Sequence, residues 1–388
     1  MIGSTPFLWV VCATRQPWLT TRFRIRQWGR LPMRRGPTLL VTNHQHEDES
    51  EIIVERGFLQ GPWRRTLFTA SSRRMYEPGF FAGRMPWLAP LVRNVNFGPM
   101  FLALGMLPLE NQLSSRPLVS LAREIAERHG DLPLREIFRD EALVPLGAGA
   151  GRVSDLQRPR YFERAQTMTK VALLRDPYRA ESVAALRRSI DEEIAFIAKI
   201  VGEGTTFFVT PEGEYSTNGK MRPLRGIMTH LAPIADVWLC AVAFDPFRGR
   251  RTSMLYRILR PANPDDIATS LAAARPVTTT ALLATFIQEH HRESFSAADA
   301  LAGIVRLRAA LPKRLFVDPE LDAARERVVR EALANLVRRG TLIEDGGRYR
   351  LGAVRTDPRF HGVQDVIAYH ATFLGETIAA AQRLDEAR

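Results

Sequence analysis

Apolar runs that end in polar residues recur along the first two thirds of the chain. Three of them have the composition of buried strands and occupy residues 37–44 (PTLLVTNH), 205–216 (TTFFVTPEGEYS) and 237–246 (VWLCAVAFDP). A further strand is predicted within residues 63–76. Such runs are typical of inner strands in an α/β sheet, where functional residues usually follow the carboxyl ends of the strands. The polar residues after the first two runs are therefore expected to form two halves of one site.

Helical spacing dominates between these runs. Residues 117–130 place apolar side chains at helical intervals and end at Gly130, a common helix stop signal. The block that starts at about residue 131 mixes Gly, Pro and Arg, and residues 180–204 then resume as a long helix. We expect a helical insertion at about 131–200 within a domain that spans residues 35–265.

The chain beyond residue 275 is predicted to be mostly helical. Helical patterns at 278–293, 296–311 and 318–340 precede a hairpin at 341–352 that turns at two glycines. Helices followed by a hairpin have the order of a winged-helix module, whose basic third helix commonly binds DNA. The predicted fold class is α/β: a central mixed sheet flanked by helices, plus a mostly helical C-terminal domain, 275–388, with a winged-helix-like hairpin.

Charge adds an anionic partner to this picture. The 388 residues carry a formal net charge of +12, almost wholly from arginine, because Lys170, Lys199, Lys220 and Lys313 are the only lysines. A phospholipid surface, CoA, an acidic carrier protein and nucleic acid are the candidates that this charge raises.

The two cysteines indicate neither a disulfide framework nor a thiolate metal site. They are Cys12 and Cys240, far apart and without CxxC spacing, and this pattern fits a reducing, cytoplasmic setting.

The N-terminal segment, residues 1–34, combines apolar and basic stretches. Its apolar patch, Pro6 to Ala13, is too short to span a bilayer, and Trp18 and Trp28 lie among arginines after it. Such a segment could rest on an anionic membrane surface or simply pack against the domain. The first reading predicts a peripheral protein at the inner face of the cell membrane.

The first polar cluster, "NHQHEDE", admits two kinds of chemistry. His44, His46 and Asp48 resemble the HxHxDH start of binuclear metallo-hydrolases, whose imidazoles and carboxylate suit Zn²⁺. That pattern requires a histidine at the next position, which is Glu49. A metallo-hydrolase that uses these three residues stays an alternative.

A strand-end histidine followed by an acid also suits general base catalysis without a metal. Asn43 and His44, with Glu49 five residues after the histidine, resemble the NHx4D motif of the glycerolipid acyltransferase family. The histidine would take a proton from an alcohol, and the carboxylate would hold its other ring nitrogen. Asp48 is a competing partner for the histidine.

The second polar cluster, about 165 residues later, strengthens this resemblance. "FFVTPEGEYSTNGKMRPLRG" is similar to the family's strand, its PEG motif and the basic stretch that follows. The resemblance covers about residues 35–250, and the tail is similar to the helical C-terminal region of bacterial glycerol-3-phosphate acyltransferases. By this resemblance the substrate-binding residues are Asn43, Pro211, Glu212, Gly213, Ser216, Lys220, Arg222 and Arg225.

Three positions depart from the family's pattern. Glu49 replaces an aspartate, and Asn111 and Tyr215 stand where family members have arginines that hold the acceptor's phosphate. An unpaired phosphate dianion in a partly desolvated site is costly. Either other cations supply the charge, or the acceptor is not a small glycerol phosphate; the candidate cations are Lys220, Arg222, Arg225, Arg116 and Arg93.

The resemblance implies an O-acyltransferase in phospholipid or lipid biosynthesis. It would move a fatty acyl group from acyl-CoA or acyl carrier protein to a hydroxyl of a glycerol phosphate, a lysophospholipid or a related lipid acceptor. No metal and no bound cofactor are expected, and nucleic acid is not expected as a partner. A non-catalytic or DNA-binding protein on the same scaffold is the further alternative.

Overall fold

The structure is a computed structural model that describes most of the chain. The described residues are 5–30, 36–46, 48–60, 67–84, 89–109, 115–147, 149–290 and 294–387. The chain divides into two compact units: unit 1 contains residues 68–200, and unit 2 contains residues 5–67 and 201–388. Each unit is described by itself below.

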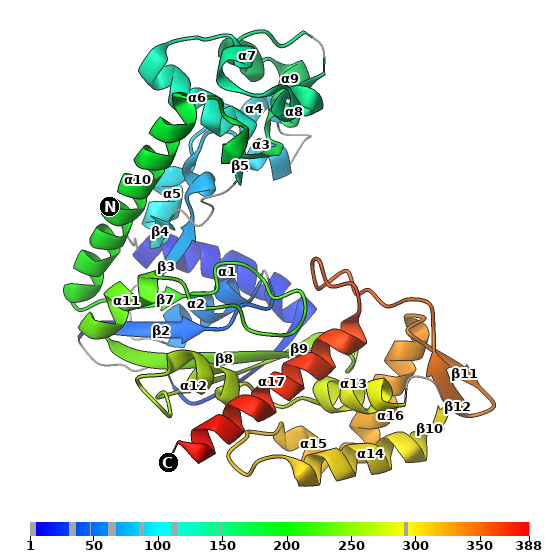
Figure 1. The fold of residues 1–388 in the computed structure, drawn as a ribbon. Coiled ribbons are helices and arrows are strands. Elements are labelled where there is room, and N and C mark those ends of the chain that lie inside the picture. The colour runs from blue at the N-terminus through cyan, green and yellow to red at the C-terminus, as the bar shows by residue number, and fades with distance from the viewer. Residues whose placement is uncertain are drawn as a thin grey trace. The chain divides into compact units, whose positions relative to one another are not determined.

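Unit 2 is built on a mixed sheet. Five of its strands lie in the order β1-β9-β8-β2-β7 (Figure 1). Strand β2 is parallel to both β7 and β8, β8 is antiparallel to β9, and β9 is parallel to β1. The bounds of these strands are β1 Phe23–Trp28, β2 Thr38–Thr42, β7 Thr206–Val209, β8 Asp236–Asp245 and β9 Thr252–Leu259.

The centre of this sheet explains the predicted strands. All five residues of β2 and all four of β7 are buried, as their continuous apolar composition predicts for strands that are covered on both faces. Thr38 lies opposite Thr206 on one side and Asp236 on the other. The three parallel strands therefore end at the same edge of the sheet. The strands predicted within 37–44, 205–216 and 237–246 are confirmed.

Helices surround the sheet of unit 2. The long helix α17 contacts α12 and α13, and Figure 1 shows it running beside them at the C-terminal end of the chain. Phe360 and Val363, which precede α17, and Tyr369 on α17 belong to the same apolar core as residues of β2, β7 and β8. The bounds are α1 Thr5–Arg22, α2 Glu49–Gln60, α11 Ile227–Leu231, α12 Ile267–Ala274, α13 Thr279–Glu289, α14 Ala297–Ala310, α15 Pro319–Ala323, α16 Arg325–Arg338 and α17 Val366–Glu386.

The predicted C-terminal hairpin is present. Strands β11 (Leu342–Asp345) and β12 (Arg348–Leu351) pair antiparallel around Gly346 and Gly347, which have φ values of +55° and +79°. The short strand β10 (Phe295–Ser296) joins them in the order β10-β12-β11. The region predicted as one helix at 318–340 is two helices, because Ala324 leaves helical geometry at φ −144°, ψ 38°.

Unit 1 is mainly helical, and its two principal predicted helices are confirmed. Helix α6 ends at Gly130, whose φ is +81°, and α10 is 25 residues long. Strands β3 and β4 pair parallel, and β5 and β6 pair antiparallel. The bounds are β3 Leu67–Ser72, α3 Phe80–Arg84, α4 Ala89–Val92, α5 Gly98–Ala103, β4 Met106–Leu109, β5 Ser115–Pro117, α6 Leu118–His129, α7 Leu134–Ile137, α8 Asp140–Leu143, α9 Pro159–Ala165, β6 Met168–Lys170 and α10 Tyr178–Gly202.

The division into units differs from the boundaries that the sequence suggested. The predicted insertion at about 131–200 lies inside unit 1, which already begins at residue 68. The predicted C-terminal domain and the N-terminal segment from residue 5 share unit 2 with the strands β2, β7 and β8. Shared apolar cores join these segments.

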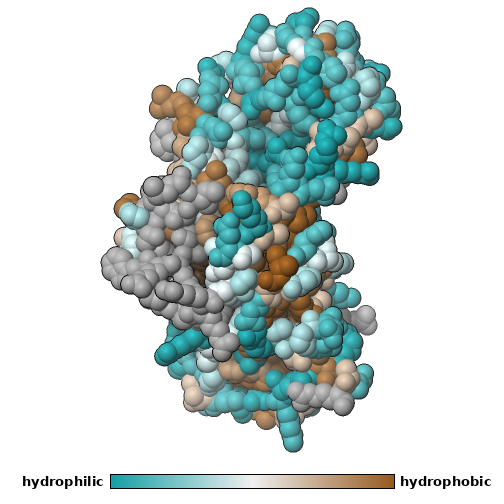
Figure 2. Space-filling view, turned by 90° about the vertical axis from the view of Figure 1, so that its left-hand side faces the viewer, coloured by the Kyte–Doolittle hydropathy of each residue, from teal (hydrophilic) through white to brown (hydrophobic). Residues whose placement is uncertain are grey.

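The surface of unit 1 in Figure 2 is mostly hydrophilic, with apolar residues in small groups. The exposed large apolar side chains of the described residues include Val144, Met168 and Phe196 in unit 1 and Val10 and Trp18 on α1 in unit 2. Within the ranges that the structure describes, no helix has the length and apolar content needed to cross a membrane.

Candidate functional site

His44 follows β2 directly, and Glu49 opens helix α2. The Nδ1 atom of His44 makes a short hydrogen bond to Oε1 of Glu49. Glu49 is fully buried, whereas the side chain of His44 keeps 13% of its surface exposed. The carboxylate therefore holds the imidazole in the tautomer whose Nε2 can accept a proton.

The second oxygen of Glu49 fixes the turn between β2 and α2. Its Oε2 accepts the backbone N–H of Gln45 at 2.9 Å and that of His46 at 3.2 Å. A carboxylate is also favourable at this position because it lies at the N-terminus of α2. All three contacts of Glu49 serve the placement of His44, so the extra methylene relative to aspartate is accommodated.

Glu212 joins the two polar clusters. Its Oε1 accepts the backbone N–H of His44 at 2.7 Å, and its Oε2 accepts the backbone N–H of Arg222 at 2.7 Å. The backbone N–H of Ser216 donates to the carbonyl of His44 at 3.1 Å. Two segments 168 residues apart are thus bonded at the edge where β2 and β7 end. Glu212 therefore contacts the backbone of His44 and not its imidazole.

Burial makes Glu212 an unusual acid. The residue is 3% exposed, and burial raises the pKa of its carboxyl group from 4.5 to about 7. The two N–H donors and the cation of Arg275 oppose this rise, and the charge of Glu49 adds to it. Near neutral pH both protonation states of Glu212 are therefore populated.

Gly213 allows the sharp turn after β7. Its φ is +71°, and a Cβ at this position would lie 2.3 Å from Nε of Arg225, so any larger residue would displace that guanidinium. The N–H of Gly213 donates to the carbonyl of Thr210 at 3.0 Å. This amide therefore closes the turn.

Three residues expected to bind substrate hold the backbone instead. The side chain of Asn43 is 1% exposed and exchanges two hydrogen bonds with the backbone of Val242, at 3.0 and 2.8 Å. The buried Pro211 accepts the N–H of Arg225 through its carbonyl at 2.9 Å. Oγ of Ser216 accepts the N–H of Gly219 at 3.0 Å. The side chains of Asn43 and Ser216 and the carbonyl of Pro211 thus hold the backbone around the site.

Two of the three candidate cations in the second cluster lie next to Glu214. Arg222 makes a short ion pair with Glu214, and Nη2 of Arg225 lies 3.6 Å from the same carboxylate. Arg222 and Lys220 are exposed. Burial, followed by the charge of Arg222, lowers the pKa of Arg225. Glu214, which belongs to none of the motifs, neutralises part of the charge that an anionic substrate would use.

The other candidate cations, Arg93 and Arg116, belong to unit 1. Arg116 donates there to Glu124 at 2.6 Å and to Glu77 at 3.2 Å. Asn111, the position of a missing family arginine, lies outside the described residues. Tyr215, the other such position, places its ring 4.2 Å from the imidazole of His44, centroid to centroid.

Asp48 and His46 point to other partners. Oδ2 of Asp48 lies 3.3 Å from Nη1 of Arg22 and 3.6 Å from Nδ1 of His46. Glu49 is therefore the carboxylate that contacts His44. Within the described ranges, no group of three or more histidine, cysteine, aspartate or glutamate side chains is arranged to hold a metal ion.

His46 is a buried residue. The residue is 3% exposed, with its ring 5.0 Å from Phe244, 5.6 Å from Phe23 and 5.9 Å from Phe360. Burial lowers its pKa to about 4, with the charge of Arg22 acting in the same direction. His46 is thus a neutral imidazole in an aromatic cluster.

Helix α17 supports the site through contacts that the sequence did not predict. Gln45 donates to the hydroxyl of Tyr369 at 3.3 Å, and Glu376 accepts the N–H of Met221 at 2.8 Å. Glu376 also pairs at 2.8 Å with Arg275, which is 1% exposed. The resemblance of the tail to a helical C-terminal region indicated helices here, but it did not indicate these contacts.

In this arrangement the imidazole of His44 has a buried carboxylate partner, Glu49. A second buried carboxylate, Glu212 in the turn after β7, holds the backbone of the histidine. Such a histidine can remove a proton from a bound hydroxyl group and return it to a leaving group. No protein-family model and no curated protein sequence matches the chain.

Proposed function

We propose that the chain is an O-acyltransferase of the glycerolipid acyltransferase type. The observation that carries the proposal is the bonding of the two clusters into one unit, with His44 paired to Glu49 and its backbone held by Glu212. The order and spacing of the two motifs support the same conclusion, since each motif alone is common and both together are not.

The proposed reaction needs one general base. Nε2 of His44 takes the proton of the acceptor hydroxyl while the oxygen attacks the carbonyl of an acyl thioester. The tetrahedral intermediate then expels the thiol sulfur, which takes the proton back from His44, and an ester is formed. Glu49 stabilises the imidazolium between the two proton transfers. This sequence of steps requires no metal and no bound cofactor.

The donor and the acceptor follow from the same proposal. The donor is acyl-CoA or acyl carrier protein, and the acceptor is a glycerol phosphate, a lysophospholipid or a related lipid alcohol. Tyr215 beside His44 and the pairing of Arg222 with Glu214 favour an acceptor with less charge near the reacting hydroxyl than a small glycerol phosphate. Lysophospholipids and neutral lipid alcohols therefore belong in the first assays.

Exchanging Glu49 for glutamine tests the proposal with little change in volume. The glutamine oxygen will accept the N–H groups of Gln45 and His46, so its NH₂ must donate to Nδ1 of His44. The proton of His44 then moves to Nε2, and the base is lost. We expect the rate of acyl-thioester consumption to fall by about 100-fold or more. The assay pairs acyl-CoA or acyl carrier protein with glycerol-3-phosphate, dihydroxyacetone phosphate, lysophosphatidate and neutral lipid alcohols.

Glu51→Gln is the matched control, because Glu51 is an exposed acid on the same helix. It should keep the wild-type rate. Equal rates in wild type, Glu49→Gln and Glu51→Gln with every acceptor would sink the assignment of His44 as base.

We also propose that α1 docks the protein on the inner face of the cell membrane. Leu8, Cys12 and Leu19 bury one side of the helix, whereas Val10 and Trp18 are 61% and 45% exposed. The guanidinium of Arg22 lies 4.5 Å from the Trp18 ring. An exposed indole among arginines suits the interface of an anionic bilayer.

Trp18→Ala should weaken binding to phosphatidylglycerol-containing vesicles by about fivefold, because the indole supplies much of the exposed apolar area of α1. Co-sedimentation at low salt measures the effect. Phe196→Ala removes an exposed aromatic side chain from unit 1 and serves as the control. Wild-type protein that stays in the supernatant would remove this part of the proposal.

A further inference from the structure

A second polar site in unit 2 lies where the turn between β8 and β9 faces β1 and α16. The turn, residues 246–251, has the sequence PFRGRR. It borders a cavity of about 490 Å³. The lining residues are Arg24, Arg248, Gly249, Arg250, Arg251, Ser253, Arg327 and Glu331. Five guanidinium groups and one carboxylate thus surround one space.

Buried hydrogen bonds to Thr280 and Asn335 hold this turn in place. Phe247 is 1% exposed, and its N–H donates to Oγ1 of Thr280 at 3.1 Å. Asn335 on α16 donates to the carbonyls of Phe247 and Gly249, at 2.9 and 3.2 Å. These buried contacts fix the backbone on which three of the arginines stand, so the cavity is formed without a ligand.

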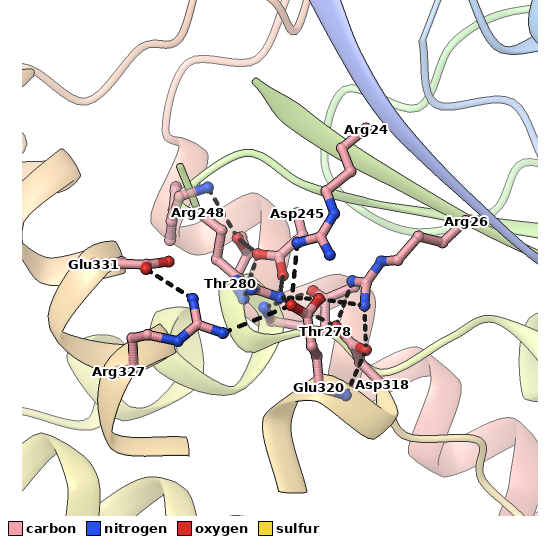
Figure 3. Close-up of polar contacts among 12 residues, drawn as sticks. Arg24, Arg26, Asp245, Arg248, Thr278, Thr280, Asp318, Glu320, Arg327 and Glu331 are labelled. Carbon is pink, nitrogen blue, oxygen red and sulfur yellow. Dashed lines mark hydrogen bonds and ion pairs between the residues drawn. The ribbon is translucent and has the colours of Figure 1, made fainter. Parts of the chain in front are cut away.

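Arg248 supplies a buried guanidinium to this cavity. The residue is 3% exposed, and Nη1 lies 3.2 Å from Glu320 and 3.5 Å from Asp318. Within the described part of the chain its Nε is buried without a hydrogen-bond partner. Figure 3 shows this network, in which Arg24 and Arg26 extend from β1 toward the same two acids. One donor of a nine-tenths buried guanidinium is therefore unused.

Positive charge exceeds negative charge at the opening. Arg327 pairs with Glu331 at 2.9 Å. The charges of Arg24, Arg26 and Arg248 are offset by three acids, Asp318, Glu320 and Asp245, the last of which lies 4.0 Å from Arg248. Arg250 and Arg251 are exposed, and among the described residues neither makes a salt bridge. Arg251 donates only to a neutral acceptor, the carbonyl of Thr20, at 2.7 Å. The surplus lies on these two residues of the turn.

We propose that this cavity binds the phosphoryl group of an anionic ligand. Guanidinium groups bind phosphate oxygens in pairs of hydrogen bonds, and a preformed basic concavity adds the attraction of its whole field. The volume exceeds what a single phosphate fills and suits a diphosphate or an organic phosphate. The ligand is either a free phosphate compound or the headgroup of an anionic phospholipid. This inference does not depend on acyl transfer.

Calorimetric titration with inorganic pyrophosphate tests the free form of the ligand, and co-sedimentation with phosphatidylglycerol vesicles tests the headgroup. Both are run at about 0.15 M NaCl, where loose surface attraction is largely screened. The wild-type chain should bind at least one of the two probes. The double variant Arg250→Gln/Arg251→Gln should bind that probe about tenfold more weakly, since it loses two charge-assisted contacts at exposed positions.

Arg306→Gln/Arg330→Gln is the matched control. Its two arginines are 64% and 69% exposed, lie outside the cavity lining, and carry the same total charge. Affinity lost only in the first double variant supports the cavity as the site, and the probe that responds identifies the source of the phosphoryl group. Equal losses in both double variants, or no binding of either probe by wild type, would overturn the proposal.

Discussion

His44→Ala is expected to reduce the turnover number for acyl transfer by about 1000-fold, the largest effect of any single substitution in the site. The loss follows from removing the group that, in the proposed reaction, accepts the proton of the acceptor hydroxyl. Folding should be preserved, because Glu49 keeps its hydrogen bonds to the N–H groups of Gln45 and His46. Steady-state rates with a saturating acyl thioester measure the effect, and thermal unfolding checks the fold.

A double variant separates a working pair from two independent residues. If Glu49 acts only through His44, His44→Ala/Glu49→Gln should be no slower than His44→Ala alone. Independent roles would instead multiply the two losses. His230→Ala removes an exposed histidine from the same unit and should leave the rate unchanged. Retained activity in His44→Ala would refute the catalytic assignment.

Glu212→Gln is expected to change the pH dependence of stability by about 3 kcal/mol between pH 4.5 and pH 8. Folding raises the pKa of Glu212 from 4.5 to about 7, so the folded protein binds this proton more tightly than the unfolded chain does. The stability that the proton contributes is complete below pH 4.5 and is lost as the pH rises through 7. Glutamine does not titrate, so the variant avoids this loss.

The substitution also lowers the free energy of unfolding by an amount that does not depend on pH. Both neighbours of the carboxylate are backbone N–H donors, from His44 and Arg222, and glutamine offers only one oxygen to them. Denaturant unfolding of both proteins across this pH range measures the difference between them. Glu203→Gln, at an exposed position, is the control for removing a carboxylate. Stability curves for wild type and Glu212→Gln that run parallel would contradict the expectation.

The central strands were the part of the fold that the sequence predicted best. β2, β7 and β8 are covered on both faces, so most of their residues are apolar and the strands can be recognised from composition alone. The helices α6 and α10 were also predictable. Gly130 marks the end of α6, and α10 has the helical spacing of apolar residues that indicates a long helix. In both cases the signal is local.

Contacts between distant segments were not predictable in the same way. The break at Ala324 separates α16 from the short helix α15, whose N-cap residue Asp318 pairs with Arg26 on β1 at 2.5 Å. Likewise, α17 belongs to the sheet unit because Tyr369 packs in its core. Nothing in the spacing of either segment indicates a partner that lies hundreds of residues away.

The same distinction applies to the site. The positions of His44, Glu49 and Glu212 at strand ends were suggested by motif and spacing. The sequence did not indicate that Asn43, Pro211 and Ser216 hold the backbone. A polar or rigid residue near a strand end looks the same in the sequence whether it binds substrate or supports the backbone. The burial of His46 depends on three aromatic rings from separate elements, which no sequence pattern connects.

Helix α17 determines when the site can be complete during synthesis. The loop that follows Glu212 lies directly on this helix, because a Cβ at Gly219 would be 2.1 Å from the carbonyl of Tyr369 and Met221 bonds to Glu376. His44 and Glu212 both leave the ribosome well before residues 366–386 do. A nascent chain therefore carries both halves of the site but not the helix that supports them. The site is therefore complete only after α17 has left the exit tunnel.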